Sequence, residues 1–462
     1  MNKLATDTPR RSDAPTQWGL VLLSLVFVGV NALLFGVSVP TASFLEADAL
    51  TYHRMALQLF DTGALHENQR QPLYPILIAG TFLVSGSTDL VLLIGVQLVF
   101  LYLTGIVAWL VAGNWLSHNA AMAVFGLVIL NPNAIANAHL PLADTLHALV
   151  FMLAVWALLS WGTGGRYWFA LACGALLGLA SLTRPETKFL LYILPVAIVL
   201  VRLVAGRPGA LKVGIPLGIA SLAVAFIVAM PWMLHNQAAG HGFGITGGTK
   251  ASENIRGHFA LVEEARTGTP QQAAIRRLTA QEPDLLLAAG LENATNDEVR
   301  SFLFRHYTGR ILDTELVILI KLYSKAWVAQ FASGGAQTLN RLLDIPYART
   351  DKFMNRPGSA GVFFDSIREQ PLAGTLITLL CIGFAIAARL LGLFGLLTMF
   401  TRRHWPLLLV IAAVLAFKGT VHLFYGIARY RLPVEPLLMV LAVYGWEGIR
   451  AQLPGRRRQW AG

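Results

Sequence analysis

Residues 46–75 hold the densest group of side chains that could carry out chemistry, and they follow directly on the first long apolar segment. Two carboxylates, Glu46 and Asp48, stand two residues apart, and on an extended approach to a helix they could share a metal ion. Asp48 could instead serve only as the N-cap of a helix. A polar island beside lipid is costly unless it serves a function. The candidate site residues of this segment are Glu46, Asp48, Tyr52, His53, Arg70 and Tyr74.

The elements that must position these side chains are membrane spans. The 462-residue chain is 55% hydrophobic and 13% charged, whereas soluble domains have about 25% charged residues. Many runs reach the roughly 20 apolar residues that cross a bilayer. The sequence therefore predicts an all-α, polytopic integral membrane protein. The expected bundle has about ten transmembrane helices, near 18–40, 89–113, 119–137, 145–161, 167–183, 187–205, 211–234, 371–399, 405–425 and 432–450.

Two further apolar stretches are predicted not to cross the membrane. Residues 72–86 contain two prolines and, at 1.5 Å per residue, are too short for a hydrocarbon core of roughly 30 Å. Residues 311–332 contain two lysines and several aromatic residues, which suits an amphipathic helix on the outer surface. With the N-terminus inside, the arginine-bearing loops and both termini then fall on the cytoplasmic side. This bias also accounts for the net charge of +11, so nucleic-acid binding is not indicated.

The spans divide the chain into four parts. Residues 1–17 form a cytoplasmic tail, and residues 18–234 form a transmembrane module whose first outer loop is 41–71. Residues 235–370 are predicted as an outer, periplasmic helical domain. Residues 371–462 supply the last helices and a basic tail.

This topology places more charged residues at span ends on the outer side, where arginine is otherwise disfavoured. A pair of arginines at a membrane face suits an anionic phosphate group better than simple anchoring. Each arginine could instead extend to the interface, and Asp144 could only cap its helix. The candidate site residues of this second set are Asp144, Arg184, His235, Arg429 and Arg431.

Several other patterns point to no chemistry. The stretch that starts at Gly242 has GxGxxG spacing, but it follows a membrane span and lacks a βαβ context, so it does not predict a nucleotide site. Gly174 and Gly178 form a GxxxG pattern that favours close helix packing. The two cysteines, Cys173 and Cys381, lie in apolar runs without CxxC or histidine partners. They predict neither a disulfide framework nor a zinc site.

The order and spacing of the outer-side motifs resemble those of the GT-C polyprenol-phosphate-sugar glycosyltransferases. Within that superfamily the sequence is most similar to bacterial members of the glycosyltransferase 39 family, which includes protein mannosyltransferases and aminoarabinose transferases. The resemblance covers about 18–240 and 405–450. His235 stands where the family more often has arginine. The matching residues are Asp48, Tyr52, His53, Gly63, Arg70, Pro72, Pro75, Asp144, Arg184, Pro185, Glu186, Pro231, Trp232, His235, Asn236, Arg429 and Pro433.

The resemblance implies a membrane glycosyltransferase with an inverting mechanism and a polyprenyl-phosphate-linked sugar donor. Asp48 matches the catalytic aspartate and Asp144 the second acid, while Arg184, Arg429 and Arg431 would be available for the lipid phosphate. The acceptor would be a lipid, glycan or protein reached from the periplasmic face of the bacterial inner membrane. A divalent metal held through Glu46, Asp48 and Asp144 stays open.

Three other functions compete with this interpretation. A polymerase or ligase would transfer a preassembled lipid-linked glycan, and a scaffold would use only the outer domain. A transporter typically shows paired repeats and broken helices at the membrane midplane. The sequence shows no internal repeat, and its polar residues lie at span ends. These features favour the enzyme.

Overall fold

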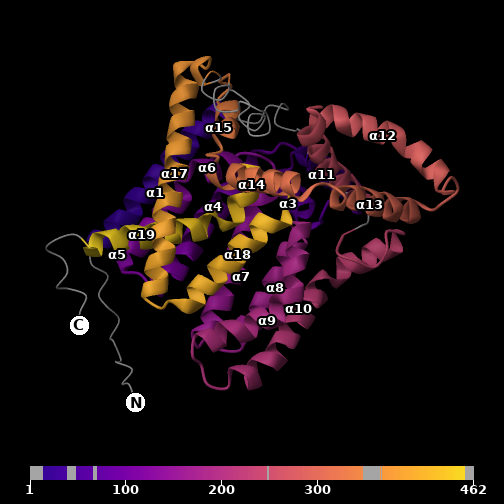
Figure 1. Ribbon diagram of the computed structural model, residues 1–462. Coiled ribbons are helices and arrows are strands. Elements are labelled where there is room, and N and C mark those ends of the chain that lie inside the picture. Colours follow the sequence, from indigo (N-terminus) through magenta and orange to yellow (C-terminus); the bar gives the residue numbers. More distant parts are fainter. Residues whose placement is uncertain are drawn as a thin grey trace.

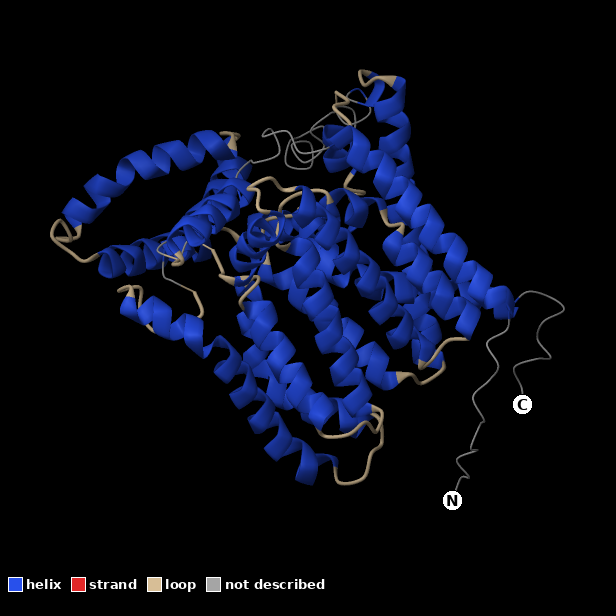
Figure 2. Cartoon of the chain, turned by 180° about the vertical axis from the view of Figure 1, so that it is seen from behind, coloured by secondary structure: helices blue, strands red, loops and turns tan. Residues whose placement is uncertain are grey.

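The structure is a computed structural model that describes residues 14–38, 48–65, 70–246, 249–346, 365 and 367–452, and these residues form helices and loops without a strand. Figures 1 and 2 show a helical bundle with a smaller group of helices beside one end of it. The predicted all-α membrane architecture is thus confirmed. The helices of the N-terminal half are α1 (Ala14–Ser38), α2 (Asp48–Thr62), α3 (Leu73–Ser85), α4 (Val91–Gly113), α5 (His118–Ile129), α6 (Pro132–Ala138), α7 (Asp144–Gly162), α8 (Trp168–Ser181), the 3₁₀ helix η2 (Pro185–Thr187), α9 (Lys188–Val204) and α10 (Ala210–Ala238).

The C-terminal half begins with three helices outside the main bundle, and the helices that follow them return to it. Its described helices are α11 (Thr249–Thr267), α12 (Gln271–Ala288), α13 (Asn296–Leu312), α14 (Leu316–Ala332), α15 (Ala336–Leu342), α17 (Leu372–Thr401), α18 (Trp405–Val421), the 3₁₀ helix η4 (Ala428–Val434) and α19 (Glu435–Gln452).

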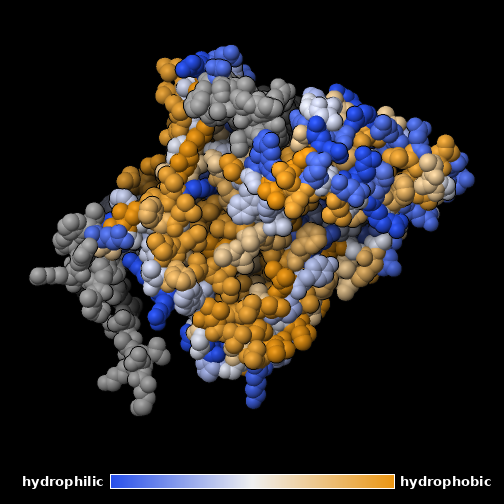
Figure 3. Space-filling view, viewed as in Figure 1, coloured by the Kyte–Doolittle hydropathy of each residue, from blue (hydrophilic) through white to orange (hydrophobic). Residues whose placement is uncertain are grey.

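Burial separates the central spans from the peripheral ones. In both α7 and the η4–α19 span, 78% of the most apolar window is buried, compared with 17% in α1 and 28% in α10 and α17. The peripheral helices expose large apolar side chains such as Leu379 and Leu393, which is stable only against lipid. Figure 3 shows this apolar surface in orange over the bundle. Helices and loops that pack against α7 therefore lie in the interior of the bundle.

The number of spans differs from the predicted ten. Among the described residues, seven helices are long and apolar enough to cross a bilayer, and the number reaches nine if two bent pairs each count as one span. The predicted spans at α8 and α18 have only 14 and 17 residues, or about 21 and 26 Å at 1.5 Å per residue. The predicted short segment at 72–86 is the 13-residue α3.

The two bent pairs are α5–α6, with an angle of 49°, and α14–α15, with an angle of 53°. The first bend has a local cause, because Asn131 caps α6 and Pro132 cannot continue the hydrogen bonds of α5. The second pair includes the predicted surface helix. Helices α14 and α15 together are long and apolar enough to form a broken span or a re-entrant loop.

Close helix packing explains the two glycines of the GxxxG pattern in α8. A Cβ on Gly174 would lie 2.1 Å from the Ser221 carbonyl oxygen, and one on Gly178 would lie 2.7 Å from that of Ala225. Both oxygens belong to α10. Any larger residue would push α8 and α10 apart.

Helices α11, α12 and α13 pack around their own small core of Phe259, Val262, Leu278, Leu303 and Tyr307. Figure 3 shows hydrophilic residues gathered over this group, in contrast to the bundle. The loops that join α9 to α10 and α17 to α18 lie at the opposite end of the bundle (Figure 1). This arrangement suits an aqueous environment for α11–α13 on one side of the membrane.

Cysteine labelling tests the predicted orientation. In a variant without Cys173 and Cys381, cysteines at Asp61 and Glu253 are expected to react with a membrane-impermeant reagent added outside, because both positions should face the periplasm. A cysteine at Pro208, in the loop between α9 and α10, should react only after the membrane is opened. Labelling of the first two positions from opposite sides would contradict the predicted orientation.

Candidate active site

Asp48 is the first residue of α2, where a carboxylate also interacts favourably with the helix dipole. The Arg70 guanidinium donates to Asp48 Oδ1, and the Arg429 guanidinium donates to Asp48 Oδ2. The three side chains remain 22–24% exposed. Two arginines therefore hold the Asp48 carboxylate at a surface that solvent can reach.

Asp144 is the first residue of α7, and it is buried deeper, with 3% of its side chain exposed. Its Oδ1 accepts from Arg184, whose Nε also lies 2.7 Å from Glu186 Oε1. The N-cap of α7 is Ala143, which makes no side-chain cap, so Asp144 is not merely the capping residue. Pro185 explains the position of Arg184, because a residue before proline is extended and projects from the end of α8.

Lys418 extends this network into the bundle. Its ammonium group lies 3.3 Å from Glu186 Oε1, and its side chain is fully buried. A buried cation requires such a partner, since an unpaired charge away from water is very costly. Glu186 thus links the arginine before η2 to a lysine in α18.

Tyr430 joins the Asp48 and Asp144 groups. The Arg184 and Arg429 guanidinium carbons lie 5.2 Å and 5.5 Å from the centre of its ring, within the range of cation–π attraction. Arg429 also interacts electrostatically with both Asp48 and Asp144. The structure therefore brings eight residues into one cluster: the predicted Asp48, Arg70, Asp144, Arg184 and Arg429, together with Glu186, Lys418 and Tyr430.

Two predicted tyrosines form the wall behind Asp48. The rings of Tyr52 and Tyr74 meet edge to face at 5.0 Å, and the Arg70 guanidinium lies over Tyr52. Burial raises the pKa of Tyr52 to about 12, so its hydroxyl stays protonated at neutral pH. The Tyr74 hydroxyl donates to Gln97, which in turn donates to the Ala138 and Leu140 carbonyls. These bonds fix the wall that orients Arg70.

The other predicted site residues lie elsewhere or outside the described residues. His53 packs on Phe82, and burial lowers its pKa. His235 stacks on Trp232 at 4.9 Å. Arg431 is buried against Glu435 and the carbonyls of Gln330 and Ser333. Glu46 falls outside the part of the chain that the structure describes.

Three members of this network or its surroundings were not predicted as site residues, namely Glu186, Lys418 and Tyr430. Lys418 carried the clearest signal, because an ionisable residue inside an apolar run is a candidate functional residue by default. Glu186 and Tyr430 lie within the motifs of Arg184 and Arg429. Their part in the cluster becomes apparent only once the structure places the Arg184 motif against the Arg429 motif.

The donor set does not favour a metal ion. Both oxygens of Asp48 accept hydrogen bonds from arginines, and Asp144 accepts one from Arg184. Within the described ranges, no three histidine, cysteine or acidic side chains are grouped as a metal site requires. The cationic surroundings instead suit an anionic ligand.

The loop that follows α18 and leads to Arg429 is packed against α11. His258 of α11 lies 4.6 Å from the ring of Tyr425, and a Cβ on Gly257 would lie 2.2 Å from the Tyr425 hydroxyl. The Gln271 amide donates to that hydroxyl at 3.1 Å. Helices α11 and α12 therefore contact the segment that leads to Arg429.

This contact is expected to weaken in acid. Burial lowers the pKa of His258 to about 4, compared with 6.5 for an exposed histidine. The undocked form therefore takes up the proton first, so stability is lost as pH falls from 6.5 towards 4 and is unaffected above 6.5. Hydrogen exchange in α11, corrected for the intrinsic rate, should show the loss. His258→Phe should reduce this acid sensitivity, and an identical pH profile would contradict the assignment.

Comparison with solved structures identifies the class of fold. The chain is similar to the oligosaccharyltransferase of Archaeoglobus fulgidus in its apo form, with a TM-score of 0.53, 14% identity and coverage of 96% of this chain. The match covers 52% of the archaeal protein, so the chain spans about half its length. The similarity shows that the two chains share a fold.

The chain is also similar to ArnT from Cupriavidus metallidurans. The apo structure gives a TM-score of 0.39 and 17% identity, and the structure bound to undecaprenyl phosphate gives 0.42 and 16%. Each match covers 94% of this chain and 78% of ArnT. No protein-family model and no curated protein sequence matches the chain.

Proposed function

We propose that the protein is a membrane glycosyltransferase that moves a sugar from a polyprenyl-phosphate donor to an acceptor on the periplasmic face, with inversion. The observation that carries this proposal is the cluster around Asp48 and Asp144. Side chains from both ends of the sequence meet there, and Asp48 can be reached from solvent. The resemblance to the glycosyltransferase 39 family is part of the proposal.

The charge of the cluster suits a phosphate. Its ion pairs link three carboxylates, those of Asp48, Asp144 and Glu186, to four cationic side chains. The cations outnumber the acids by one among these residues. An arriving phosphate can form charge-assisted hydrogen bonds with Arg429 and Arg184, which stabilise the charge that develops on the leaving group.

Donor binding would also prepare Asp48. In the structure both of its oxygens accept from arginines. A phosphate that draws Arg429 away would release the hydrogen bond that Arg429 donates to Asp48 Oδ2. That oxygen would then orient the acceptor and take its proton as the acceptor attacks the sugar from the face opposite the phosphate. The proton ends on Asp48 and the electron pair of the broken bond on the phosphate.

A radiolabelled donor assay tests this function. Membranes that contain the protein should convert a polyprenyl-phosphate sugar to polyprenyl phosphate plus a glycosylated acceptor, and membranes without it should not. The stereochemistry of the product bond should be opposite to that of the donor. Accumulation of the same donor inside sealed vesicles, without loss of its sugar, would favour a transporter instead.

A further inference from the structure

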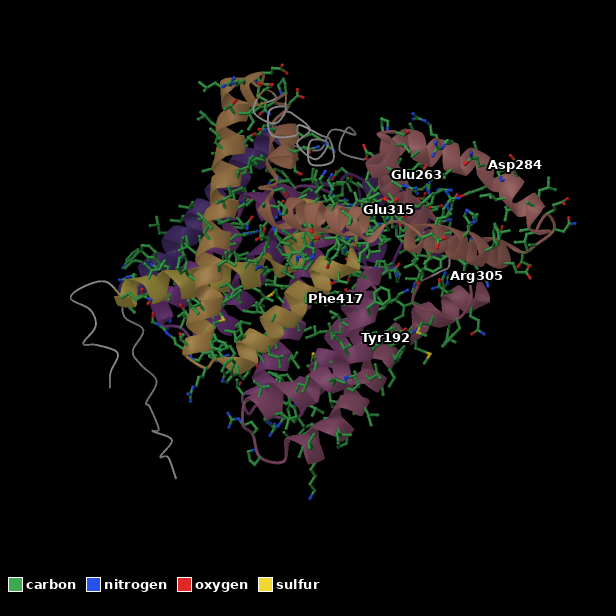
Figure 4. All side chains as sticks on the ribbon, viewed as in Figure 1. Tyr192, Glu263, Asp284, Arg305, Glu315 and Phe417 are labelled. Carbon is green, nitrogen blue, oxygen red and sulfur yellow. The ribbon has the colours of Figure 1, made fainter. Side chains whose placement is uncertain are left out.

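A cavity of about 570 Å³ lies between α13 and the segment that follows α10. One wall is the glycine-rich stretch that starts at Gly242, and the other carries Arg300, Phe304 and Arg305. Figure 4 labels Arg305 on α13, near the end of α10. The volume lies within the range of about 300–1,000 Å³ found for small-molecule sites.

The glycine-rich wall is held in one conformation by side chains of the bundle. Asn236 donates to the Gly244 carbonyl at 2.8 Å, and Trp232 donates to the Ile245 carbonyl at 3.1 Å. Gly242 has a φ of +80°, which a residue with a side chain adopts only with strain. The wall is thus preorganised, which lowers the cost of binding a ligand.

This wall is also bonded to the active-site loop. Gln71 donates to the Ile245 carbonyl at 3.0 Å, and its neighbour Arg70 holds Asp48. The backbone N–H of Leu73 donates to the Leu182 carbonyl at 3.1 Å, two residues before Arg184. The glycine-rich wall of the cavity is therefore hydrogen-bonded to the segment that carries Arg70.

The lining chemistry points to a negatively charged sugar. Arg300, Arg305 and His241 carry cationic or donor groups, and none of the described side chains that line the cavity is acidic. The rings of Phe243 and Phe304 are 55% and 42% exposed, and such rings offer apolar faces for the C–H surface of a saccharide. Arginines beside open aromatic rings suit a ligand with both an anionic group and a sugar face.

We propose that this cavity binds the acceptor and that the acceptor is an anionic saccharide, with a carboxylate or a phosphate as its charged group. The proposal rests on the proposed function and names its acceptor class. It also gives the stretch at Gly242 a role, as the wall of an acceptor site. The bond from Gln71 to Ile245 ties this wall to the neighbour of Arg70, which holds Asp48.

Equilibrium binding to the full-length protein in lipid nanodiscs tests the proposal without any donor. The probes are a glucuronic acid oligosaccharide, glucose 6-phosphate and the neutral maltotetraose. At least one anionic probe is expected to bind at least tenfold more tightly than maltotetraose, and which one binds tells carboxylate from phosphate. Equal binding of all three, or binding of none, would overturn the anionic class.

Variants locate the site. Arg305→Ala is expected to weaken binding of the anionic probe about tenfold, because it removes a charge-assisted hydrogen bond. Arg276→Ala makes the same charge change on an exposed position of α12 outside the cavity and should leave binding unchanged. An equal loss of probe affinity in both variants would show that the probe is attracted to basic surface in general. That result would overturn the assignment of the site to this cavity.

The test is separable from the proposed function. The binding assay contains no donor, so its outcome does not depend on whether the protein transfers sugar. In transfer assays Arg305→Ala should raise the KM for the acceptor about tenfold and leave the KM for the donor unchanged. Transfer activity with unchanged acceptor KM in Arg305→Ala would reject the cavity while leaving the glycosyltransferase in place.

Discussion

Asp48→Asn is expected to lower sugar transfer by about 10²–10⁴-fold, the usual contribution of a general base. Asparagine keeps the size of the side chain but cannot take the acceptor proton. Its amide also cannot satisfy the Arg70 and Arg429 guanidinium groups as the carboxylate does. Single-turnover transfer of the labelled donor, normalised to folded protein, measures the effect.

Asp61→Asn is the matched control, because Asp61 lies on the same helix and is exposed. It should transfer sugar at the wild-type rate. Comparable turnover of Asp48→Asn and Asp61→Asn, at equal protein level, would remove Asp48 from the catalytic role.

Arg429→Ala is expected to raise the KM for the donor roughly tenfold to a hundredfold. Hydrogen bonds between charged groups contribute about 1.5–3 kcal/mol, and each 1.4 kcal/mol is a factor of ten. Arg429→Lys should recover only part of the affinity, because lysine keeps the charge but loses the planar fork. Initial rates over a series of donor concentrations measure KM, with Arg276→Ala as the control for a lost surface charge.

Arg184→Ala should behave differently from Arg429→Ala. Arg184 is paired with two buried carboxylates, Asp144 and Glu186, and breaking a buried ion pair costs about 3–5 kcal/mol. The variant should therefore lose thermal stability as well as donor affinity, whereas Arg429→Ala should keep most of its stability. If an arginine only anchors its helix in the interface, its alanine variant will show unchanged donor KM. An unchanged donor KM in both Arg184→Ala and Arg429→Ala would contradict phosphate binding by these arginines.

A meeting of Asp48 with an arginine from the far end of the sequence was a reasonable expectation, because the arginine asymmetry placed both at span ends on one side. Asp48 and Arg429 are 381 positions apart, yet both were expected at outer span ends. Which arginine meets which acid could not be predicted. A span that is apolar on every side gives no periodic signal of the face it buries, so the rotation of each helix becomes visible only in the packed bundle.

Arg431 shows this limit most clearly. The sequence presents Arg429 and Arg431 as a pair, but η4 is a 3₁₀ helix. At three residues per turn, two positions apart means about 240° of rotation. Arg429 therefore meets Asp48, and Arg431 meets Glu435. Arg431 then stabilises the start of α19 through Glu435. This role follows from the buried position of Arg431 and could not be predicted from its residue type.

The break between α5 and α6 could have been read from the sequence. Asn131 followed by Pro132 is a recognised turn signal, although the surrounding residues are apolar enough for one continuous span. The length of that apolar run led to the prediction of an unbroken helix. The helix breaks at this point because the Asn131 side chain accepts hydrogen bonds from the free N–H groups at the start of α6.

The single excess positive charge of the cluster has a consequence for turnover. A sugar-bearing polyprenyl phosphate is a diester with one negative charge, which the excess cation balances. Removal of the sugar leaves a monoester, whose second ionisation near pH 6 adds negative charge at neutral pH. The spent carrier is then the stronger ligand of the same arginines. In the proposed reaction, the steady-state rate would therefore depend on how quickly the spent carrier leaves the site.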